Sequence, residues 1–168
     1  MYYGFILPLR VKSGMPDGES PVKLLIMRHG EAKPFGGQFE DDRRPLTRRG
    51  SQLLEPVANK LAQFEPELIL VSPFLRTQQT ADIVTEQLPN AYQRKNCDWL
   101  LSESSVEQAV LQLDKLVEDK VLMVSHMPFV SLLVEYLTGQ SLGFRPGDVV
   151  QLEFDFVGRG QGECHWIT

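Results

Sequence analysis

The sequence predicts an α/β fold, namely a single three-layer domain in which helices cover both faces of a mainly parallel central sheet. Three short runs of residues are apolar without polar alternation, which is typical of strands buried on both faces. Stretches with apolar residues at helical spacing separate these runs, as in sheets built from strand–helix–strand units. The 168 residues, of which 42% are hydrophobic, suffice for the core of one such domain.

The first half of the domain is predicted to alternate between strand and helix. The expected elements are a strand at 23–27, a helix at 46–64, a strand at 67–72 and a helix at 74–88. Thr47 is a good N-cap for the first helix, because its hydroxyl can accept a hydrogen bond from a free backbone N–H. Pro56 is expected to bend this helix or to break it locally.

The second half continues the alternation and ends in two strands. The expected elements are a helix at 105–117, a strand at 120–125, a helix at 129–139 that Gly139 closes, and strands at 148–156 and 162–167. The stretch between the second helix and the strand at 120–125 must supply a strand and a helix. It is too short for a large cap insertion, so a shallow, open pocket with solvent-facing side chains is expected.

The amino-terminal residues differ in composition from the rest. They begin with an apolar stretch, continue with Gly, Pro and Ser, and place Arg10 and Lys12 after the apolar part, which is the reverse of a secretory signal. We therefore expect residues 1–21 to be a flexible leader and residues 22–168 to form the domain.

Charge and cysteine content exclude several classes of function. A formal net charge of −5 argues against general binding to nucleic acid or to an anionic membrane surface. No apolar run approaches the roughly 20 residues that cross a bilayer. Cys97 and Cys164 are too few for a disulfide framework or a four-ligand zinc site, so reduced thiols in a cytoplasmic protein are expected.

Arginine or histidine side chains follow each of the three buried strands. Arg28 and His29 follow the first, Arg76 comes soon after the second, and His126 follows the third. Ligands of open α/β sheets bind at the carboxyl ends of the strands, so these side chains are expected to meet in one site. Each residue alone would more often be a solvated surface group, but four such residues at equivalent positions predict a function.

The motifs LIMRHGEA, RPLTRRG, LVSPFLRTQQTA and VSHMP, in this order, resemble those of the histidine phosphatase superfamily, in its phosphoglycerate-mutase-like branch. The compact layout resembles the small SixA-type phosphohistidine phosphatases. The resemblance implies a phosphatase without a cofactor that forms a covalent phosphohistidine on His29. It also implies that Arg28, Arg76 and His126 bind the phosphoryl oxygens and that Arg44 matches a further arginine of the pocket.

The chemistry of these residue types agrees with that role. Guanidinium groups bind phosphate oxygens bidentately and stay charged, and a neutral imidazole is a nucleophile near neutral pH. A zinc site built from His29, His126 and His165 is the alternative, but the neighbouring arginines would repel a cation and no metalloprotease spacing is present. We therefore expect a metal-independent enzyme and a structural or solvated His165.

The proton donor stays open at this stage. Glu103 and Glu31 are both candidates, whereas Met127 occupies the position at which the acid-phosphatase branch has an aspartate. An imidazole leaving group needs little acid, so the expected substrate is phosphohistidine on a signalling or phosphotransfer protein, such as a histidine-containing phosphotransfer domain. The alternative is a phosphatase of small phosphomonoesters or of phosphoserine and phosphothreonine proteins with the same centre. An inactive phosphate-binding module is a further alternative, weakened because no residue of the centre is substituted.

Overall fold

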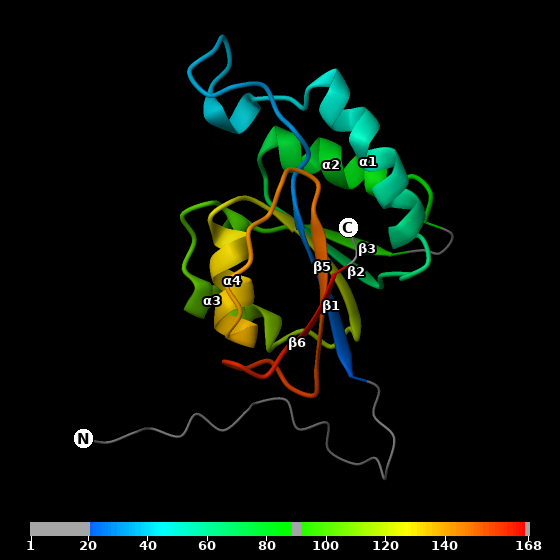
Figure 1. Ribbon diagram of the computed structural model, residues 1–168, viewed down its shortest axis with the longest axis vertical. Coiled ribbons are helices and arrows are strands. Elements are labelled where there is room, and N and C mark those ends of the chain that lie inside the picture. Colours follow the sequence, from blue (N-terminus) through cyan, green and yellow to red (C-terminus); the bar gives the residue numbers. More distant parts are fainter. Residues whose placement is uncertain (1–20, 89–91, 167–168) are drawn as a thin grey trace, which may run out of the picture.

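The structure is a computed structural model that describes residues 21–88 and 92–166. The predicted leader at 1–21 therefore lies outside the described residues apart from Pro21. A six-stranded sheet forms the centre of the domain, in the order β3-β2-β4-β1-β5-β6 (Figure 1). Its strands are β1 (Val22–Arg28), β2 (Leu68–Val71), β3 (Gln93–Asn96), β4 (Lys120–Ser125), β5 (Val149–Phe154) and β6 (Glu163–Trp166).

The sheet has a parallel part and an antiparallel edge. β3, β2, β4 and β1 are parallel to one another, whereas β5 runs antiparallel to β1 and β6 antiparallel to β5. β1 and β4 pair from Lys23 opposite Lys120 to Arg28 opposite Ser125. The carboxyl ends of these two strands therefore lie side by side, which confirms the predicted mainly parallel sheet.

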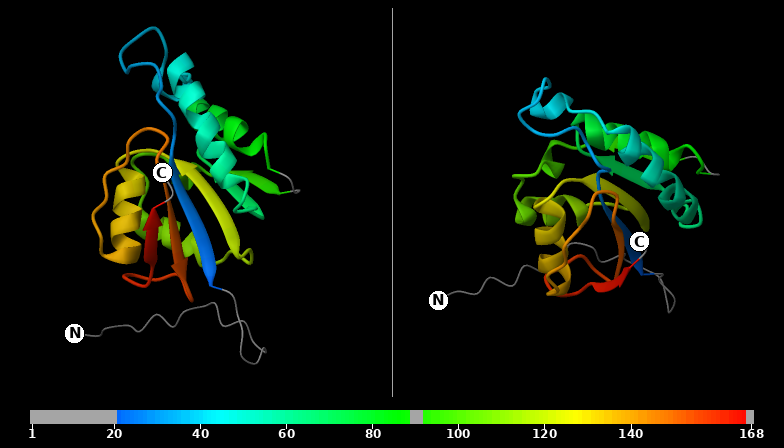
Figure 2. Two further views of the ribbon diagram at one scale, coloured as in Figure 1. Left: turned by 45° about the vertical axis from the view of Figure 1, so that its right-hand side comes forward. Right: turned by 45° about the horizontal axis from the view of Figure 1, so that its top comes forward.

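Helices cover both faces of the sheet, so the domain has the three layers that the sequence predicts (Figures 1 and 2). The helices are α1 (Arg48–Leu61) and α2 (Leu75–Thr85) on one face, and α3 (Val106–Leu113) and α4 (Phe129–Thr138) on the other. Alternate side chains of β1 enter different cores: Leu25 packs with α1 and α2, whereas Leu24 packs with α3 and α4. This double burial explains why β1 is apolar without alternation.

The sequence predicts the helix ends better than it predicts the effect of Pro56 or the position of β3. Thr47 caps α1 by accepting a hydrogen bond from the Gly50 backbone, and Gly139 ends α4 with a left-handed φ of 75°. Pro56 was expected to bend or locally break this helix; α1 continues through it, so the helix is not broken there. β3 is built from polar residues at the sheet edge, so no apolar run announced its position.

Few residues separate α2 from β4. The described part of this stretch holds β3, α3 and a short 3-10 helix, η2 (Asp98–Leu100). A second 3-10 helix, η1 (Asp41–Arg43), lies between β1 and α1. In these described residues there is no large cap insertion over the carboxyl ends of the strands.

The loop after β1 is held tightly against the amino-terminal end of α1. A Cβ atom at Gly50 would lie 2.1 Å from the Glu31 carbonyl oxygen, so only glycine permits this approach. The Thr47 backbone N–H also donates to the Glu31 carbonyl, at 2.8 Å. These contacts fix the loop that carries His29 and Gly30.

Candidate active site

A pocket of about 330 Å³ lies at the carboxyl ends of β1, β2 and β4. Separate stretches of the chain contribute its lining residues, which are Arg28, His29, Glu31, Ala32, Asp41, Arg44, Arg76, Ser102, His126, Met127 and Pro146. Every candidate residue from the sequence lines this pocket except Glu103. The structure thus brings together side chains that are far apart in the sequence.

His29 lies at the bottom of the pocket with both ring nitrogens engaged. Its Nδ1 is 2.7 Å from the Gly30 carbonyl oxygen, which can only accept a hydrogen bond. Its Nε2 is 3.2 Å from Arg76 Nε, which can only donate one. The proton of a neutral His29 therefore resides on Nδ1, and the lone pair is on Nε2.

Burial of His29 keeps the imidazole neutral. The side chain was expected to face solvent, but the residue is only 8% exposed, because α2 and the loop after β1 pack around it. This desolvation, together with the positive charges of Arg76, Arg28 and Arg44, lowers the pKa of His29 to about 4, against the opposing effect of the Gly30 hydrogen bond. At neutral pH His29 is therefore an unprotonated base.

Backbone contacts place Arg28 and Gly30 on either side of His29. Arg28 donates from NH1 to the Phe144 carbonyl oxygen at 2.6 Å. The Gly30 N–H donates to Thr80 Oγ1 at 3.0 Å, which connects the loop after β1 to α2. The carboxyl end of β1 is therefore anchored both to α2 and to the segment that precedes β5.

Arg76 occupies the first turn of α2 and is 3% exposed. Besides the contact of Nε with His29, its NH1 donates to the Asp41 carbonyl oxygen at 2.6 Å, and its NH2 lies 3.3 Å from Asp41 Oδ2. The guanidinium also lies over the ring of Phe74, 4.9 Å from the centroid. Arg76 is thus held in one orientation with its edge toward His29.

Asp41 is a pocket residue that the sequence did not predict. It is the first residue of η1, and its Oδ1 accepts from Arg44 Nε at 2.7 Å while its Oδ2 faces Arg76. Arg44 also donates to the Lys33 carbonyl oxygen at 2.6 Å. Partial burial raises the pKa of Asp41, but the hydrogen bond from Arg44 and the charge of Arg76 lower it more, so the pKa lies below its usual value.

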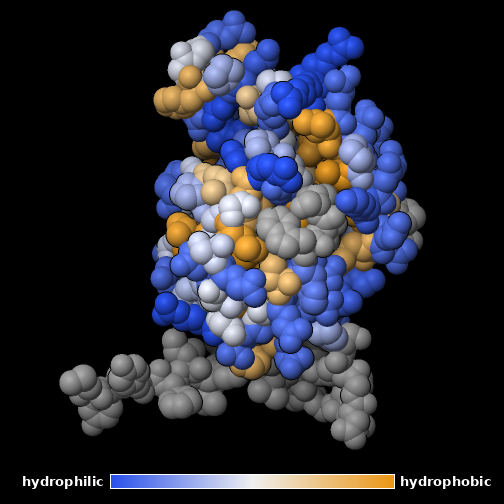
Figure 3. Space-filling model, in the orientation of Figure 1, coloured by the Kyte–Doolittle hydropathy of each residue, from blue (hydrophilic) through white to orange (hydrophobic). Residues whose placement is uncertain are grey.

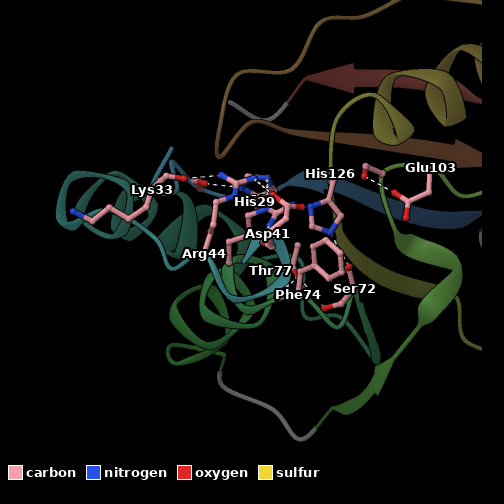
Figure 4. Close-up of polar contacts among 12 residues, drawn as sticks. His29, Lys33, Asp41, Arg44, Ser72, Phe74, Thr77, Glu103 and His126 are labelled. Carbon is pink, nitrogen blue, oxygen red and sulfur yellow. Dashed lines mark hydrogen bonds and ion pairs between the residues drawn. The ribbon is translucent and has the colours of Figure 1, made fainter. Parts of the chain in front are cut away.

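His126 follows β4 and is 1% exposed. Its Nε2 is 2.7 Å from Ser72 Oγ, at the end of β2, and its ring lies 5.2 Å from that of His29 between centroids. Figure 4 shows His126 between Ser72 and His29. Desolvation and the nearby His29 and Arg76 lower the pKa of His126 to about 3, so this ring is also neutral.

Two polar atoms of the pocket residues are buried and have no hydrogen-bond partner within the described residues, namely Arg28 Nε and His126 Nδ1. Buried polar atoms are nearly always paired, so these two indicate where a ligand would bind. Arg28 Nε is a donor. His126 Nδ1 is a donor whenever the Ser72 hydroxyl donates to Nε2. Both atoms suit an anion.

The two candidate acids have different surroundings. Glu31 lines the pocket, but its Oε1 accepts from Thr47 Oγ1 at 2.7 Å, at the N-cap of α1. Glu103 is exposed and does not line the pocket; Ser102, which does line it, donates its hydroxyl to Glu103 Oε2 at 2.6 Å. In Figure 4, Glu103 lies on the far side of His126 from His29.

A second hollow, of about 410 Å³, adjoins the first and shares Glu31 and Pro146 with it. Its other lining residues are Arg49, Leu53, Val57, Arg145, Gly147 and Asp148. Leu53 is 53% exposed, so the hollow has an apolar wall next to charged groups. Figure 3 likewise shows hydrophobic patches set among hydrophilic residues on one face of the molecule.

Other candidate features lie elsewhere. The described residues contain no group of three or more His, Cys, Asp or Glu side chains that could hold a metal ion. His165 is exposed on β6, opposite Gln151. Burial raises the pKa of the Cys97 thiol to about 11, which leaves it unreactive. Of the helices described, none is long and apolar enough to span a membrane.

The strand ends predicted the four central residues of the pocket, Arg28, His29, Arg76 and His126, but not the rest of its lining. Ser72 directly follows the buried strand β2, so the strand-end rule could have identified it. Asp41 lies in the short 3-10 helix η1 and Ser102 in a loop, and no sequence pattern relates them to Arg76 or His126. Chemically, the arrangement offers a neutral nucleophile surrounded by fixed cationic and neutral donors, which suits transfer of a phosphoryl group.

Comparisons with known proteins agree with this chemistry. The family model described as histidine phosphatase superfamily (branch 1) matches residues 24–100. A phosphohistidine phosphatase SixA homolog of Haemophilus influenzae is 30% identical over 148 residues, which is 80% of this chain and 89% of the relative. Phosphohistidine phosphatase SixA of Escherichia coli is 34% identical over 121 residues, which is 69% of this chain and 74% of the relative.

Solved structures show the same fold. The structure of the protein histidine phosphatase SixA complexed with tungstate is 31% identical and has a TM-score of 0.77, covering 86% of this chain and 94% of its own. A putative phosphohistidine phosphatase SixA from Agrobacterium tumefaciens, at 21% identity, has a TM-score of 0.73 over 89% of this chain and 97% of its own.

Proposed function

This chain belongs to the histidine phosphatase superfamily, and from that premise we propose that it removes the phosphoryl group from phosphohistidine on a signalling or phosphotransfer protein. Its similarity to SixA proteins supports phosphatase activity, whereas the substrate and the catalytic steps are our proposal. The observation that carries the proposal is the neutral state of His29. Its proton is on Nδ1, so the lone pair of Nε2 is available among three arginines.

The reaction would proceed in two displacements. In the first, His29 Nε2 attacks the phosphorus, the bond between phosphorus and the substrate imidazole breaks, and that imidazole leaves with its electron pair. In the second, water attacks the phosphorus of phosphorylated His29, the new N–P bond breaks, and inorganic phosphate and neutral His29 result. Each displacement passes through a state with negative charge spread over the phosphoryl oxygens.

Arg28, Arg44, Arg76 and His126 would stabilise this charge. Arg28 Nε is a buried donor with no partner among the described residues, and His126 Nδ1 is another when the Ser72 hydroxyl donates to Nε2, so both positions would be set before a ligand arrives. Donors that need no reorientation are the most effective in stabilising a transition state. The Gly30 carbonyl, by holding Nδ1–H, would stabilise the positive charge that develops on His29 after it attacks.

The leaving group supports phosphohistidine as the substrate. Imidazole leaves as a weak base with a conjugate-acid pKa of roughly 6.5, so it needs little assistance from an acid. Glu103 lies outside the pocket, and Glu31 is hydrogen-bonded to Thr47. The adjoining hollow, with Leu53 next to charged groups, offers room for protein residues that surround a phosphohistidine, such as those of a histidine-containing phosphotransfer domain.

The alternative substrate is a small phosphomonoester or a phosphoserine or phosphothreonine protein. The observation in its favour is that Glu31 does line the pocket, so a carboxyl group lies within the site. An alkoxide leaving group depends on an acid, and general acid catalysis contributes about 10²- to 10⁴-fold. Removing a true acid would therefore lower activity on such a substrate by that order.

The deciding experiment compares substrates and variants. We would measure kcat/KM on a phosphorylated histidine-containing phosphotransfer domain and on a phosphoserine peptide, for the wild type, Glu31→Gln and Glu103→Gln. We expect the phosphohistidine protein to be preferred and neither variant to affect its hydrolysis. Faster hydrolysis of phosphoserine that collapses in one variant would favour the alternative.

A trapping experiment tests the intermediate. Rapid quenching with a substrate carrying radioactive phosphate should yield a labelled enzyme whose label is lost in acid and retained in base. Labelling that persists in His29→Ala would contradict the assignment of the nucleophile. We also expect activity to survive EDTA and to be inhibited by vanadate; loss on chelation that zinc or magnesium restores would overturn the proposal of a metal-independent enzyme.

A further inference from the structure

We propose that Asp41 acts as an internal competitor of the phosphoryl group, occupying the donors of Arg44 and Arg76 between turnovers and promoting the release of inorganic phosphate. The inference rests on the proposed function in so far as the pocket binds phosphate. Asp41 is neither the proposed nucleophile nor a hydrogen-bond donor to the phosphoryl oxygens. Asp41 acts through two arginines and is therefore a positioning residue.

The contacts of Asp41 are those that an oxyanion would make. Its Oδ1 accepts from Arg44 Nε at 2.7 Å and lies 2.6 Å from Arg44 NH2, so one carboxylate oxygen contacts two nitrogens of the guanidinium. Its Oδ2 lies 3.3 Å from Arg76 NH2. One carboxylate thus joins two arginines that line the same pocket as His29.

These contacts use much of the binding capacity of Arg76. A guanidinium has donors on three nitrogens, and in Arg76 each nitrogen already has a partner: His29, the Asp41 carbonyl and the Asp41 carboxylate. NH1 and NH2 each have a second N–H, so a phosphoryl group can bind to Arg76 beside the carboxylate and compete with it for the charge and the donors of NH2. The bond to the backbone carbonyl keeps Arg76 in place while this happens.

The position of Asp41 allows such an exchange. Its side chain is 36% exposed, whereas that of Arg76 is 4% exposed. Asp41 lies on the short helix η1, outside the sheet, and its carboxylate is the more exposed partner of the pair. It can withdraw toward solvent, which the arginine cannot do.

The charge of Asp41 acts against a bound phosphate. A phosphate dianion and a carboxylate that share the same arginines repel each other. The repulsion weakens both the substrate and the product complex, because both contain the phosphoryl group. Since product release limits many enzymes, a residue that weakens the hold on phosphate raises the rate of turnover at the cost of a higher KM.

The test compares Asp41→Asn with Asp42→Asn. Both variants remove one negative charge from η1, but Asp42 does not line the pocket. We would measure the dissociation constant of inorganic phosphate by calorimetry, and its inhibition constant together with kcat and KM on an aryl phosphate. We expect Asp41→Asn to bind phosphate about fivefold more tightly than the wild type. Asp42→Asn should change the dissociation constant of phosphate less than twofold, because repulsion weakens with distance and is screened by solvent.

The kinetic signature distinguishes this role from a structural one. In Asp41→Asn, KM and kcat should both fall, because the phosphoryl group binds better and phosphate leaves more slowly. A merely structural residue would, when lost, raise KM and weaken phosphate binding. Unchanged or weaker binding of phosphate in Asp41→Asn overturns the inference, and Asp41→Ser, which also removes the charge, decides in the same way if Asp41→Asn does not fold.

The failure of this inference differs from the failure of the proposed function. If the wild type binds no phosphate, or if Arg76→Ala binds it as well as the wild type, the pocket is not a phosphate site and both ideas fail. If the wild type binds phosphate through Arg76 but Asp41→Asn does not tighten it, only the role of Asp41 is wrong.

Discussion

The carboxyl ends of β1 and β4 are neighbours in the sheet, and each is followed by a buried, neutral histidine. The two histidines differ in which ring nitrogen is hydrogen-bonded to a neighbouring oxygen. His29 is held through Nδ1 by a backbone carbonyl, so its Nε2 lone pair faces Arg76. His126 is held through Nε2 by the Ser72 hydroxyl, and its Nδ1 has no partner among the described residues. The partner of the ring, and not the type of residue, therefore determines whether a strand-end histidine is suited to attack or to donate.

Removal of the proposed nucleophile should have the largest effect. We expect His29→Ala to lose activity on a phosphohistidine protein by at least about 10⁴-fold, because we propose that His29 forms the covalent intermediate. Steady-state rates, and labelling of the enzyme after a quench in base, would measure this. His29 is buried, so circular dichroism and a thermal melt must accompany the assay. A folded variant that retains activity would show that the two histidines have been assigned the wrong roles.

Loss of the donor at the other strand end should be less severe. We expect His126→Asn to reduce kcat by about 10²- to 10³-fold, which is the usual effect of removing one preorganised donor to a developing negative charge. Labelled enzyme should still form, though slowly, because His29 is intact. If His126→Asn abolishes labelling while His29→Ala does not, the two roles are exchanged.

The hydroxyl that holds His126 should have a smaller effect. Ser72→Ala removes the partner of Nε2 and frees the ring to change its protonation, so we expect a loss of about 10-fold in kcat. Ser125→Ala is the matched control: Ser125 also ends a buried strand, but its hydroxyl donates to the Leu100 carbonyl, 2.7 Å away. Equal losses in the two variants would indicate a general packing defect and would contradict the role of the hydrogen bond to His126.

Acid should destabilise the folded protein through both strand ends. The pKa of His126 is about 3 in the folded protein but roughly 6.5 in an unfolded chain, so between these values the unfolded chain binds more protons. The free energy of unfolding therefore falls as the pH falls below about 6.5. Between pH 7 and 4.5, His126→Asn should lose about 2.5 kcal/mol less stability than the wild type, because each pH unit below about 6.5 contributes about 1.4 kcal/mol.

Urea titrations at several pH values would measure this difference. His165→Asn provides the control, because His165 is exposed on β6. If wild type and His126→Asn lose stability equally as the pH falls, the burial of a neutral His126 is not a source of acid sensitivity.

Much of the fold follows from the sequence because its signals are local. Apolar runs identify β1, β2 and β4, and Thr47 and Gly139 mark helix ends through bonds and angles of their own. β3 carries no such signal, since it lies at the sheet edge and is polar. The burial of His29 was not predicted either, because it depends on α2, which is distant in the sequence.

The pocket shows the same limit. Arg28, Arg76 and His126 could be found because strand ends converge in a parallel sheet. The bridge from Arg44 through Asp41 to Arg76 could not, because it depends on how η1 lies against α2. Glu103 was proposed from its residue type alone, and only the structure shows that Ser102, its neighbour, lines the pocket instead.

The pairing of β1 has a consequence for the order in which the molecule is assembled. β1 lies near the start of the described chain, yet its partners are β4 and β5, which a ribosome produces much later. Contacts between residues so far apart in the sequence form slowly. The strand that carries Arg28 is therefore paired on both sides only after most of the chain has been synthesised. A nascent or truncated chain without β4 and β5 therefore lacks the enclosed site and should not hydrolyse substrate, so the first hydrolysis during synthesis would report that β1 has paired with β4 and β5.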